Sequence, residues 1–152
     1  MNTIIVYYSR TGTTKELAEF LAKKLDCRAI ELIDLTNRKG PLAYLLGGRD
    51  AMQRKLTQIE KVKEDVFKYD LVIIGTPVWG SNVTPAVRTF LTQNPVKKVA
   101  FFATAGGTNL GLTFHEMEKL TATPKATLAL TTTEVNSNKF REKTEEFIKK
   151  LI

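Results

Sequence analysis

Strand-like and helix-like hydrophobic patterns alternate along the chain. Three stretches, residues 3–8, 69–75 and 96–103, predict strands, and the first is a run of β-branched and aromatic side chains without polar alternation. Such runs are typical of parallel strands that are buried on both faces of a sheet. Between residues 14 and 25, apolar residues recur every three or four positions, which predicts an amphipathic helix. The chain therefore begins with a strand followed by a helix.

The later part of the chain repeats this order. Residues 29–33 predict a second strand, more exposed because it contains Glu31. Thr84 and Pro85 place a hydroxyl at an N-cap and a proline at the first helical position, so we expect a helix from there to about residue 93. The remaining expected elements are a helix near residues 112–120, a strand at 127–133 and a helix at 138–151.

Residues 42–66 give the weakest pattern in the sequence. An apolar cluster at residues 42–46 is followed by Gly47 and Gly48, which interrupt a regular element. The only helix we expect here runs from Asp50 to about Gln58.

Repeated strand–helix units predict the fold class. At 152 residues the chain has the length of one ordinary domain, and we expect a single domain over residues 1–152. The expected architecture is α/β: an open, doubly wound, five-stranded parallel sheet in the order 2-1-3-4-5, with helices on both faces. In such sheets, ligands bind at the carboxyl ends of the strands, where the strand order reverses. The loops at residues 9–14, 76–81 and 104–108 are expected to meet there.

The loop at residues 9–14 has the chemistry of a phosphate site. It carries four hydroxyl side chains around Gly12, with Arg10 as its one cation, and it leads directly into the first expected helix. The free N–H groups and the dipole of a helix N-terminus attract an anion. Neutral donors suffice for one terminal phosphate, whereas a triphosphate normally also needs a lysine and a magnesium ligand. The loop therefore predicts a monophosphate ligand.

The other two loops supply the walls of a slot. Trp79, the only tryptophan, follows the strand at residues 69–75 and would stack on a planar ring or simply cover the end of the sheet. Gly106 and Gly107 allow the backbone to approach a ring edge closely, although a glycine pair is equally compatible with an ordinary turn. Their common position at one edge of the sheet favours a site for an aromatic phosphate ester.

With these motifs in place, the chain resembles the flavodoxins and the wider flavodoxin-like superfamily over essentially its whole length. Residues 7–14 are similar to the phosphate loop of that superfamily, residues 75–80 to its flavin-stacking loop, and residues 103–107 to its third flavin-contacting loop. The resemblance implies flavin mononucleotide (FMN) as the cofactor. The cofactor-binding residues that it implies are Ser9, Thr11, Gly12, Thr13 and Thr14 at the phosphate, Thr76, Pro77, Val78, Trp79 and Gly80 at the ring face, and Thr104, Ala105, Gly106 and Gly107 at the pyrimidine edge.

The resemblance implies redox chemistry carried by the cofactor, and no catalytic side chain or metal ligand is assigned. Electron transfer is the expected function. The first alternative is an NAD(P)H-dependent FMN quinone or flavin reductase of the same superfamily, and the second is a module that binds flavin weakly or not at all. His115, the only histidine, is expected to be half-buried and structural, Cys27 to belong to the core, and the Arg10 side chain to point to solvent.

The charge of the chain bears on its partners. There are 23 Lys and Arg residues against 16 Asp and Glu, a net charge of +7, whereas classical flavodoxins are acidic. The excess favours a redox partner with an acidic face. The basic residues are interspersed with acidic ones, so we expect no nucleic-acid partner. A homodimer and a monomer are both compatible with the sequence.

Related α/β classes fit the sequence less well. A receiver domain needs acidic residues where Ser9 and Thr76 stand, and a low-molecular-weight phosphatase needs a cysteine in the phosphate loop, whereas Cys27 lies beyond the first helix. Neither the dinucleotide nor the Walker glycine pattern occurs. No apolar run approaches the roughly 20 residues of a membrane span, and no leader is visible, so a cytoplasmic protein is expected.

Overall fold

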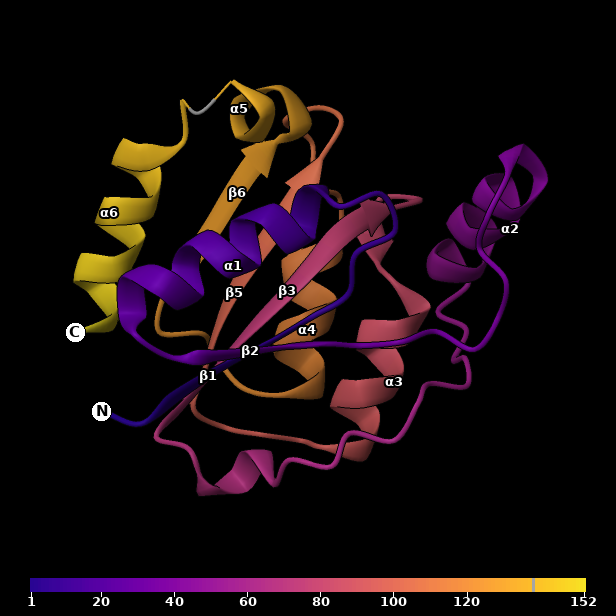
Figure 1. Ribbon diagram of the computed structural model, residues 1–152. Coiled ribbons are helices and arrows are strands. Elements are labelled where there is room, and N and C mark those ends of the chain that lie inside the picture. Colours follow the sequence, from indigo (N-terminus) through magenta and orange to yellow (C-terminus); the bar gives the residue numbers. More distant parts are fainter. Residues whose placement is uncertain (138) are drawn as a thin grey trace.

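The computed structural model describes residues 1–137 and 139–152 and has an α/β architecture (Figure 1). The strands are β1 (Thr3–Tyr7), β2 (Arg28–Glu31), β3 (Leu71–Trp79), β4 (Asn82–Val83), β5 (Val99–Ala105) and β6 (Thr127–Thr131). The helices are α1 (Thr13–Leu25), α2 (Pro41–Met52), α3 (Pro85–Gln93), α4 (Thr113–Leu120), α5 (Thr132–Asn136) and α6 (Arg141–Leu151), with a 3₁₀ turn at Val66–Lys68.

The sheet is parallel except for one short strand. Its parallel strands lie in the order β2-β1-β3-β5-β6, and β4 pairs antiparallel with the end of β3. Ile5 of β1 lies beside Ile73 of β3, which lies beside Ala100 of β5. The sequence did not predict β4, so the expected five-stranded sheet lacks one strand of the observed sheet. Two residues between turns carry too short a pattern to indicate a strand.

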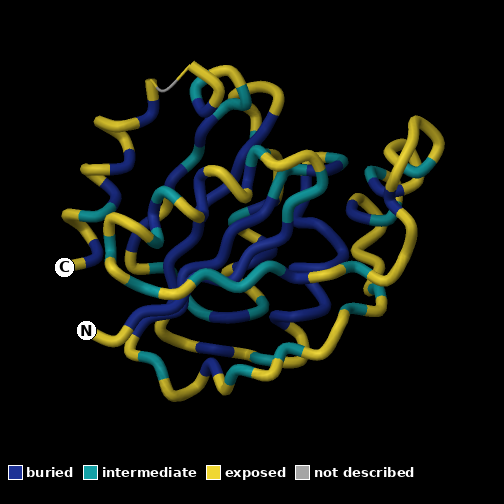
Figure 2. Tube along the Cα trace, viewed as in Figure 1, coloured by how far each residue is buried: buried dark blue, intermediate teal, exposed yellow. Residues whose placement is uncertain are grey.

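Helices cover both faces of the sheet and enclose two hydrophobic cores. On one face, Leu17 and Leu21 of α1 and Phe147 of α6 pack on Ile5 and Ile73. On the other face, Phe90 of α3, Met117 of α4 and Ala51 of α2 pack against a core that contains Ile74. The central strands are buried (Figure 2), which explains why polar residues do not alternate with apolar ones in their sequences. No helix in the described ranges is long and apolar enough to span a membrane.

Helix α2 corrects the sequence prediction for residues 42–66. The helix covers residues 41–52 instead of 50–58, and the chain after Gln53 is largely irregular. Pro41 begins the helix, and the two glycines lie inside it because they pack against β3. A Cβ atom on Gly47 would lie only 2.9 Å from Cζ3 of Trp79. The glycine pair is therefore a packing feature of a helix, not its end.

Other element boundaries also differ from the prediction. β3 continues through Trp79, so this residue lies at the end of a strand and not in a loop. The last strand ends at Thr131, where α5 begins with a capping box between Thr131 and Glu134 that the sequence pattern did not reveal. The final helix starts at Arg141, and the expected start at Asn138 lies outside the described residues.

Candidate functional site: a slot at the carboxyl edge of the sheet

The three loops predicted to meet do meet, and they line a slot of about 200 Å³. The lining residues that belong to these loops are Arg10, Thr11, Thr13, Thr14, Pro77, Val78, Trp79, Thr104, Ala105 and Gly106, and Tyr44 and Thr132 complete the slot. It lies where β1, β3 and β5 end, as expected for an open parallel sheet.

The loop before α1 is shaped to present donors. Gly12 has a φ of 104°, a left-handed conformation that favours glycine, and its N–H donates to Oγ of Ser9 over 3.1 Å. Ser9 therefore holds the loop and does not line the slot. The first turn of α1 carries N–H groups that have no intrahelical acceptor, and the hydroxyls of Thr11 and Thr13 lie beside them. These neutral donors and the helix dipole together suit an anionic ligand.

A buried hydrogen bond joins the first loop to the third. Oγ1 of Thr14 lies 2.8 Å from Oγ1 of Thr104, and both side chains are buried. Gly106 leaves open space next to this pair, because a Cβ atom on it would meet no protein atom within 4 Å. An added Cβ would instead reduce the room for a ligand. Gly107 has equally free surroundings but is not part of the slot lining.

Two residues of the middle loop that were predicted to bind the cofactor, Thr76 and Gly80, instead make contacts within the protein. Thr76 is fully buried, and its hydroxyl donates to the carbonyl of Pro77 over 2.8 Å and lies 3.1 Å from the hydroxyl of Thr84. Gly80 has a φ of 51°, and a Cβ atom there would lie 2.3 Å from the carbonyl oxygen of Gly48. Neither residue lines the slot, and Gly80 allows α2 to approach the sheet.

Trp79 is held by protein contacts on more than one side. Its ring makes an edge-on contact with Tyr8, with centroids 5.5 Å apart, and Gly47 of α2 lies against it. Only 9% of Trp79 is exposed, so a small part of the residue is open to a ligand. Trp79 is thus first a structural contact between α2 and the sheet, and its remaining surface lines the slot.

Sequence reasoning missed two slot residues, Tyr44 and Thr132, and it placed the Arg10 side chain wrongly. The Arg10 side chain does not point freely to solvent: Nε donates to the carbonyl of Arg38 over 2.8 Å, and the guanidinium lies 5.1 Å from the ring centre of Tyr44. Arg10 thereby connects the phosphate loop to α2. Tyr44 and Thr132 had no local signal, because each reaches the slot from a distant segment.

Two other expected residues lie away from the slot. His115 is exposed on α4, not half-buried, because it lies on the outward face of that helix. Cys27 is half-buried and packs at the edge of the α1 core, and burial raises the pKa of its thiol. Neither side chain lines the slot.

A second cavity, of about 330 Å³, adjoins the slot beneath α2. Tyr44, Val78 and Trp79 line both spaces. Leu45 and Met52 make the second cavity largely apolar, and Arg49 is its one charged residue. The two spaces therefore share one wall, and the second has room for another molecule.

The fold and this site define a flavodoxin-like protein: a doubly wound parallel sheet with a hydroxyl-rich phosphate loop and a slot at its carboxyl edge. More specifically, the chain belongs to the NADPH-dependent FMN reductase family, whose model matches residues 3–141. The resemblance to the flavodoxin-like superfamily is thereby confirmed, and family membership supports FMN as the cofactor.

Solved structures show the same fold. A flavoprotein from Lactobacillus acidophilus NCFM, solved in complex with FMN, is 25% identical with a TM-score of 0.71, over 90% of this chain and 97% of that one. A protein from Bacteroides uniformis ATCC 8492 is 21% identical with a TM-score of 0.72, over 90% and 96%. The apo form of an NADH:FMN oxidoreductase, EMOB, is 15% identical with a TM-score of 0.59, over 99% and 87%.

The residues of the slot fit FMN by their chemistry. One terminal phosphate matches the neutral donors of the first loop, where no lysine lies in the lining. The open backbone at Ala105 and Gly106 and the apolar surface of Val78 suit the edge and face of a ring.

Proposed function

We propose that this protein is an NAD(P)H-dependent FMN oxidoreductase that reduces a small aromatic acceptor, such as a quinone or a flavin. One structural observation carries the proposal: the apolar cavity beneath α2 joins the cofactor slot and shares Tyr44, Val78 and Trp79 with it. An electron carrier needs only an exposed cofactor edge. A reductase needs space for a second substrate at that edge, and this cavity supplies it. The family match supports the same choice.

The chain's own residues bind and orient in this proposal. Thr11, Thr13 and the first turn of α1 hold the phosphate of FMN, and Ser9 and Gly12 keep that loop in shape. Ala105 and Gly106 lie along the ring edge. When bound, FMN supplies the redox chemistry by taking a hydride from a reduced nicotinamide and passing two electrons to the acceptor.

Helix α2 serves as the cover of the acceptor cavity. Leu45 and Met52 give the cavity an apolar wall although both are largely exposed, and Arg49 lines it as a donor for a carbonyl or an anionic group. The contact of Gly47 with Trp79 and that of Gly48 with Gly80 hold the helix close to β3. An acidic redox partner, expected from the sequence, stays a prediction, and the sequence is compatible with both a homodimer and a monomer.

The purified protein, loaded with FMN, tests this proposal. We expect it to oxidise NADPH with a quinone or free flavin as acceptor, followed by the loss of nicotinamide absorbance. Met52→Trp fills the cavity and should raise the KM for the acceptor without changing the affinity for FMN. Leu42→Trp, on the exposed face of α2 and outside both cavities, is the matched control.

Two results would contradict the proposal. Absence of NADPH oxidation by the FMN-loaded protein would favour the electron carrier. A protein that binds neither FMN nor riboflavin would favour the flavin-free module. Riboflavin should bind far more weakly than FMN, because it lacks the phosphate that the first loop holds.

A further inference from the structure

Helix α2 turns its large apolar side chains away from the protein. The buried residues of this helix are Gly47 and Ala51. Its exposed apolar side chains are those of Leu42, Tyr44, Leu45, Leu46 and Met52. We refer to these five side chains as the α2 face. A helix on a protein surface normally has the opposite arrangement, with its apolar stripe towards the core, and an apolar patch of this kind marks a surface that binds a partner or a membrane.

The α2 face lies on a part of the molecule that projects from the sheet. Figure 1 shows α2 at the right-hand end of the view, apart from the helices that cover the sheet, and Figure 2 shows most of its outer turns exposed. Leu42, Leu45 and Met52 are spaced by three and seven residues, which places them on the same side of the helix. A projecting apolar ridge enters a fluid lipid layer readily, whereas a folded protein partner would need a groove that matches it.

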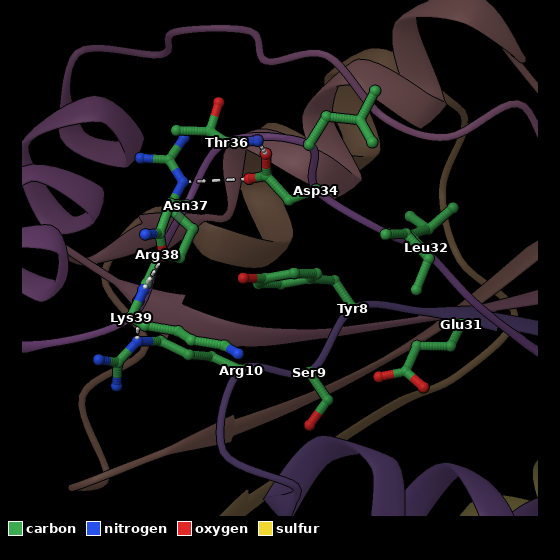
Figure 3. Close-up of a pocket in the computed structure, with 12 residues that line it drawn as sticks. Tyr8, Ser9, Arg10, Glu31, Leu32, Asp34, Thr36, Asn37, Arg38 and Lys39 are labelled. Atoms are coloured by element: carbon green, nitrogen blue, oxygen red, sulfur yellow. Dashed lines mark hydrogen bonds and ion pairs between the residues drawn. The ribbon is translucent and has the colours of Figure 1, made fainter.

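The one acidic residue of α2, Asp50, is paired inside the protein. Its carboxylate accepts from Nη1 of Arg38 over 2.8 Å. Nε of the same arginine donates to Asp34 over 3.1 Å, and the Arg38 carbonyl accepts from Nε of Arg10 over 2.8 Å (Figure 3). These bonds fix the segment that leads into α2 and compensate the negative charge of the helix.

The charges beside the α2 face favour an anionic surface. Residues 38–55 contain five basic residues and one acidic residue, so this short segment carries more than half of the net charge of +7. Arg49 and Lys55 lie 3.9 and 3.8 Å from Oδ1 of Asp50, at the outer limit of an ion pair, and about half of each side chain is exposed. Lys39 is exposed as well. Anionic lipid headgroups attract such cations, whereas a second copy of the chain would bring like charges together.

The acceptor cavity lies beneath the same side of the helix. Leu45, Arg49 and Met52 line this cavity, and all three side chains are also exposed at the surface. The cavity and the outer side of α2 therefore share side chains. A hydrophobic molecule in the outer part of a bilayer would pass between these side chains into the cavity without entering water.

We infer that α2 docks on an anionic bilayer and that the acceptor reaching the cavity is a lipid-soluble quinone. The 12 residues of α2 are too few to cross a bilayer, so the helix lies in its interface. The α2 face contacts the acyl chains, and Lys39, Arg49 and Lys55 contact the headgroups. Docking depends on the helix and its charges alone. The quinone also rests on the proposed function, in which NADPH and one proton convert one quinone to its quinol and leave NADP⁺.

Sedimentation with lipid vesicles tests docking without enzyme activity. The FMN-loaded protein is mixed with vesicles of equal parts phosphatidylglycerol and phosphatidylcholine, and with vesicles of phosphatidylcholine alone. We expect saturable binding to the first, weaker binding to the second, and a loss of affinity as NaCl is added, because salt screens the headgroups. Arg49→Gln should weaken binding to the anionic vesicles about fivefold, the loss expected for one surface cation. Lys150→Gln, on α6, is the matched control and should not alter binding.

The double variant Leu42→Asp/Leu46→Asp tests the apolar contribution. Both side chains are exposed on α2 and lie outside the acceptor cavity and the cofactor slot, so the fold and the affinity for FMN should not change. We expect vesicle binding to weaken about tenfold or more, because two leucines no longer enter the lipid. Phe67→Asp, at a similarly exposed apolar position before β3, is the control and should bind like the wild type.

Absence of vesicle binding by the wild type would overturn the inference. Sedimentation equilibrium then identifies what covers the α2 face. A dimer that the double variant converts to a monomer would assign the face to a second copy of the chain, and a monomer would assign it to a different protein.

Kinetics separate the quinone from the docking. With NADPH as donor, the FMN-loaded protein is tested on a quinone with a long isoprenoid tail in anionic vesicles and on a short-tailed, water-soluble quinone. The double variant should lose about tenfold in kcat/KM on the first and keep its rate on the second. Equal losses on both would mean that α2 serves only the cavity, which overturns the inference.

The two failures are distinguishable. Vesicle binding without NADPH oxidation on either quinone would contradict the proposed function and support the docking surface. Oxidation of NADPH with the water-soluble quinone, without vesicle binding, would overturn the docking surface and leave the proposed function standing.

Discussion

The hydroxyl groups of Thr14 and Thr104 lie 2.8 Å apart in the buried floor of the cofactor slot. One belongs to the first turn of α1 and the other to the end of β5, 90 positions later in the chain. This bond holds the phosphate loop against the third loop before any ligand binds. The spacing of the two loops, and with it the width of the slot, is thus set by a contact inside the protein.

Thr104→Val should destabilise the protein. The substitution keeps the shape of the side chain but leaves the buried Thr14 hydroxyl without its partner, which costs about 1–3 kcal/mol. Urea denaturation of the cofactor-free protein measures the loss. The double variant Thr14→Val/Thr104→Val should lose less than the sum of the single losses, because no unpaired hydroxyl is left. Strictly additive losses would mean that the two hydroxyls do not depend on each other.

Gly47→Ala and Gly48→Ala should have opposite effects. A Cβ atom on Gly47 would lie 2.9 Å from the Trp79 ring, so we expect a net loss of about 1 kcal/mol despite the better helix propensity of alanine. The nearest atom to a Cβ on Gly48 is 3.9 Å away, so this variant should gain about 0.5–1 kcal/mol. Thermal unfolding measures the stability of both variants, and tryptophan fluorescence reports the surroundings of Trp79 in each. Equal gains would show that α2 is not packed on Trp79.

Gly106→Ala should weaken FMN binding without affecting the fold. Its Cβ would meet no protein atom within 4 Å, and it would extend into the slot. We expect unchanged urea stability of the cofactor-free protein and an FMN affinity that is lower by about tenfold or more, since overlap of one methyl group costs about 1–3 kcal/mol. Gly107→Ala, equally free of protein contacts but outside the slot lining, is the control. Unchanged affinity in both variants would place the ring elsewhere.

Protonation of Glu116 should lower the stability of the protein in acid, because it weakens the ion pairs of this carboxylate. The Arg54 guanidinium, which donates over 2.8 Å, holds the pKa of this buried carboxyl below its usual value, and Arg88 contributes in the same direction. A lowered folded-state pKa gives stability that is present above the unfolded pKa, roughly 4.3, and is lost as pH falls through the folded value. As the pH falls below that value, the free energy of unfolding of Glu116→Gln should therefore decrease less steeply than that of the wild type, which denaturant unfolding measures. Glu145→Gln, exposed on α6, should follow the wild type.

The sequence contained enough information for the general location of the site. Buried strands can be recognised by unbroken apolar runs, such as the one that contains Ile73. Because parallel strands end at the same edge of a sheet, Thr11, Thr13 and Thr104 are then expected to lie close together. These predictions depend on local patterns and on connection rules that hold for all such sheets. The prediction of a phosphate site was equally local, because it depends on one continuous loop.

The other half of the site was decided by tertiary packing. In the sequence, Gly47 and Gly48 look like an interruption of a helix. In the structure they lie within α2, where the absence of a side chain allows close packing against Trp79 and Gly80. Helix α2, Tyr44 and the cavity beneath the helix could therefore not be placed from the local sequence. Arg10 also acquired its role only through the distant carbonyl of Arg38. Periodicity and loop composition determined which strands form the sheet and which donors lie near their carboxyl ends. Close approach between remote segments, which leaves no local signal, decided what covers the slot.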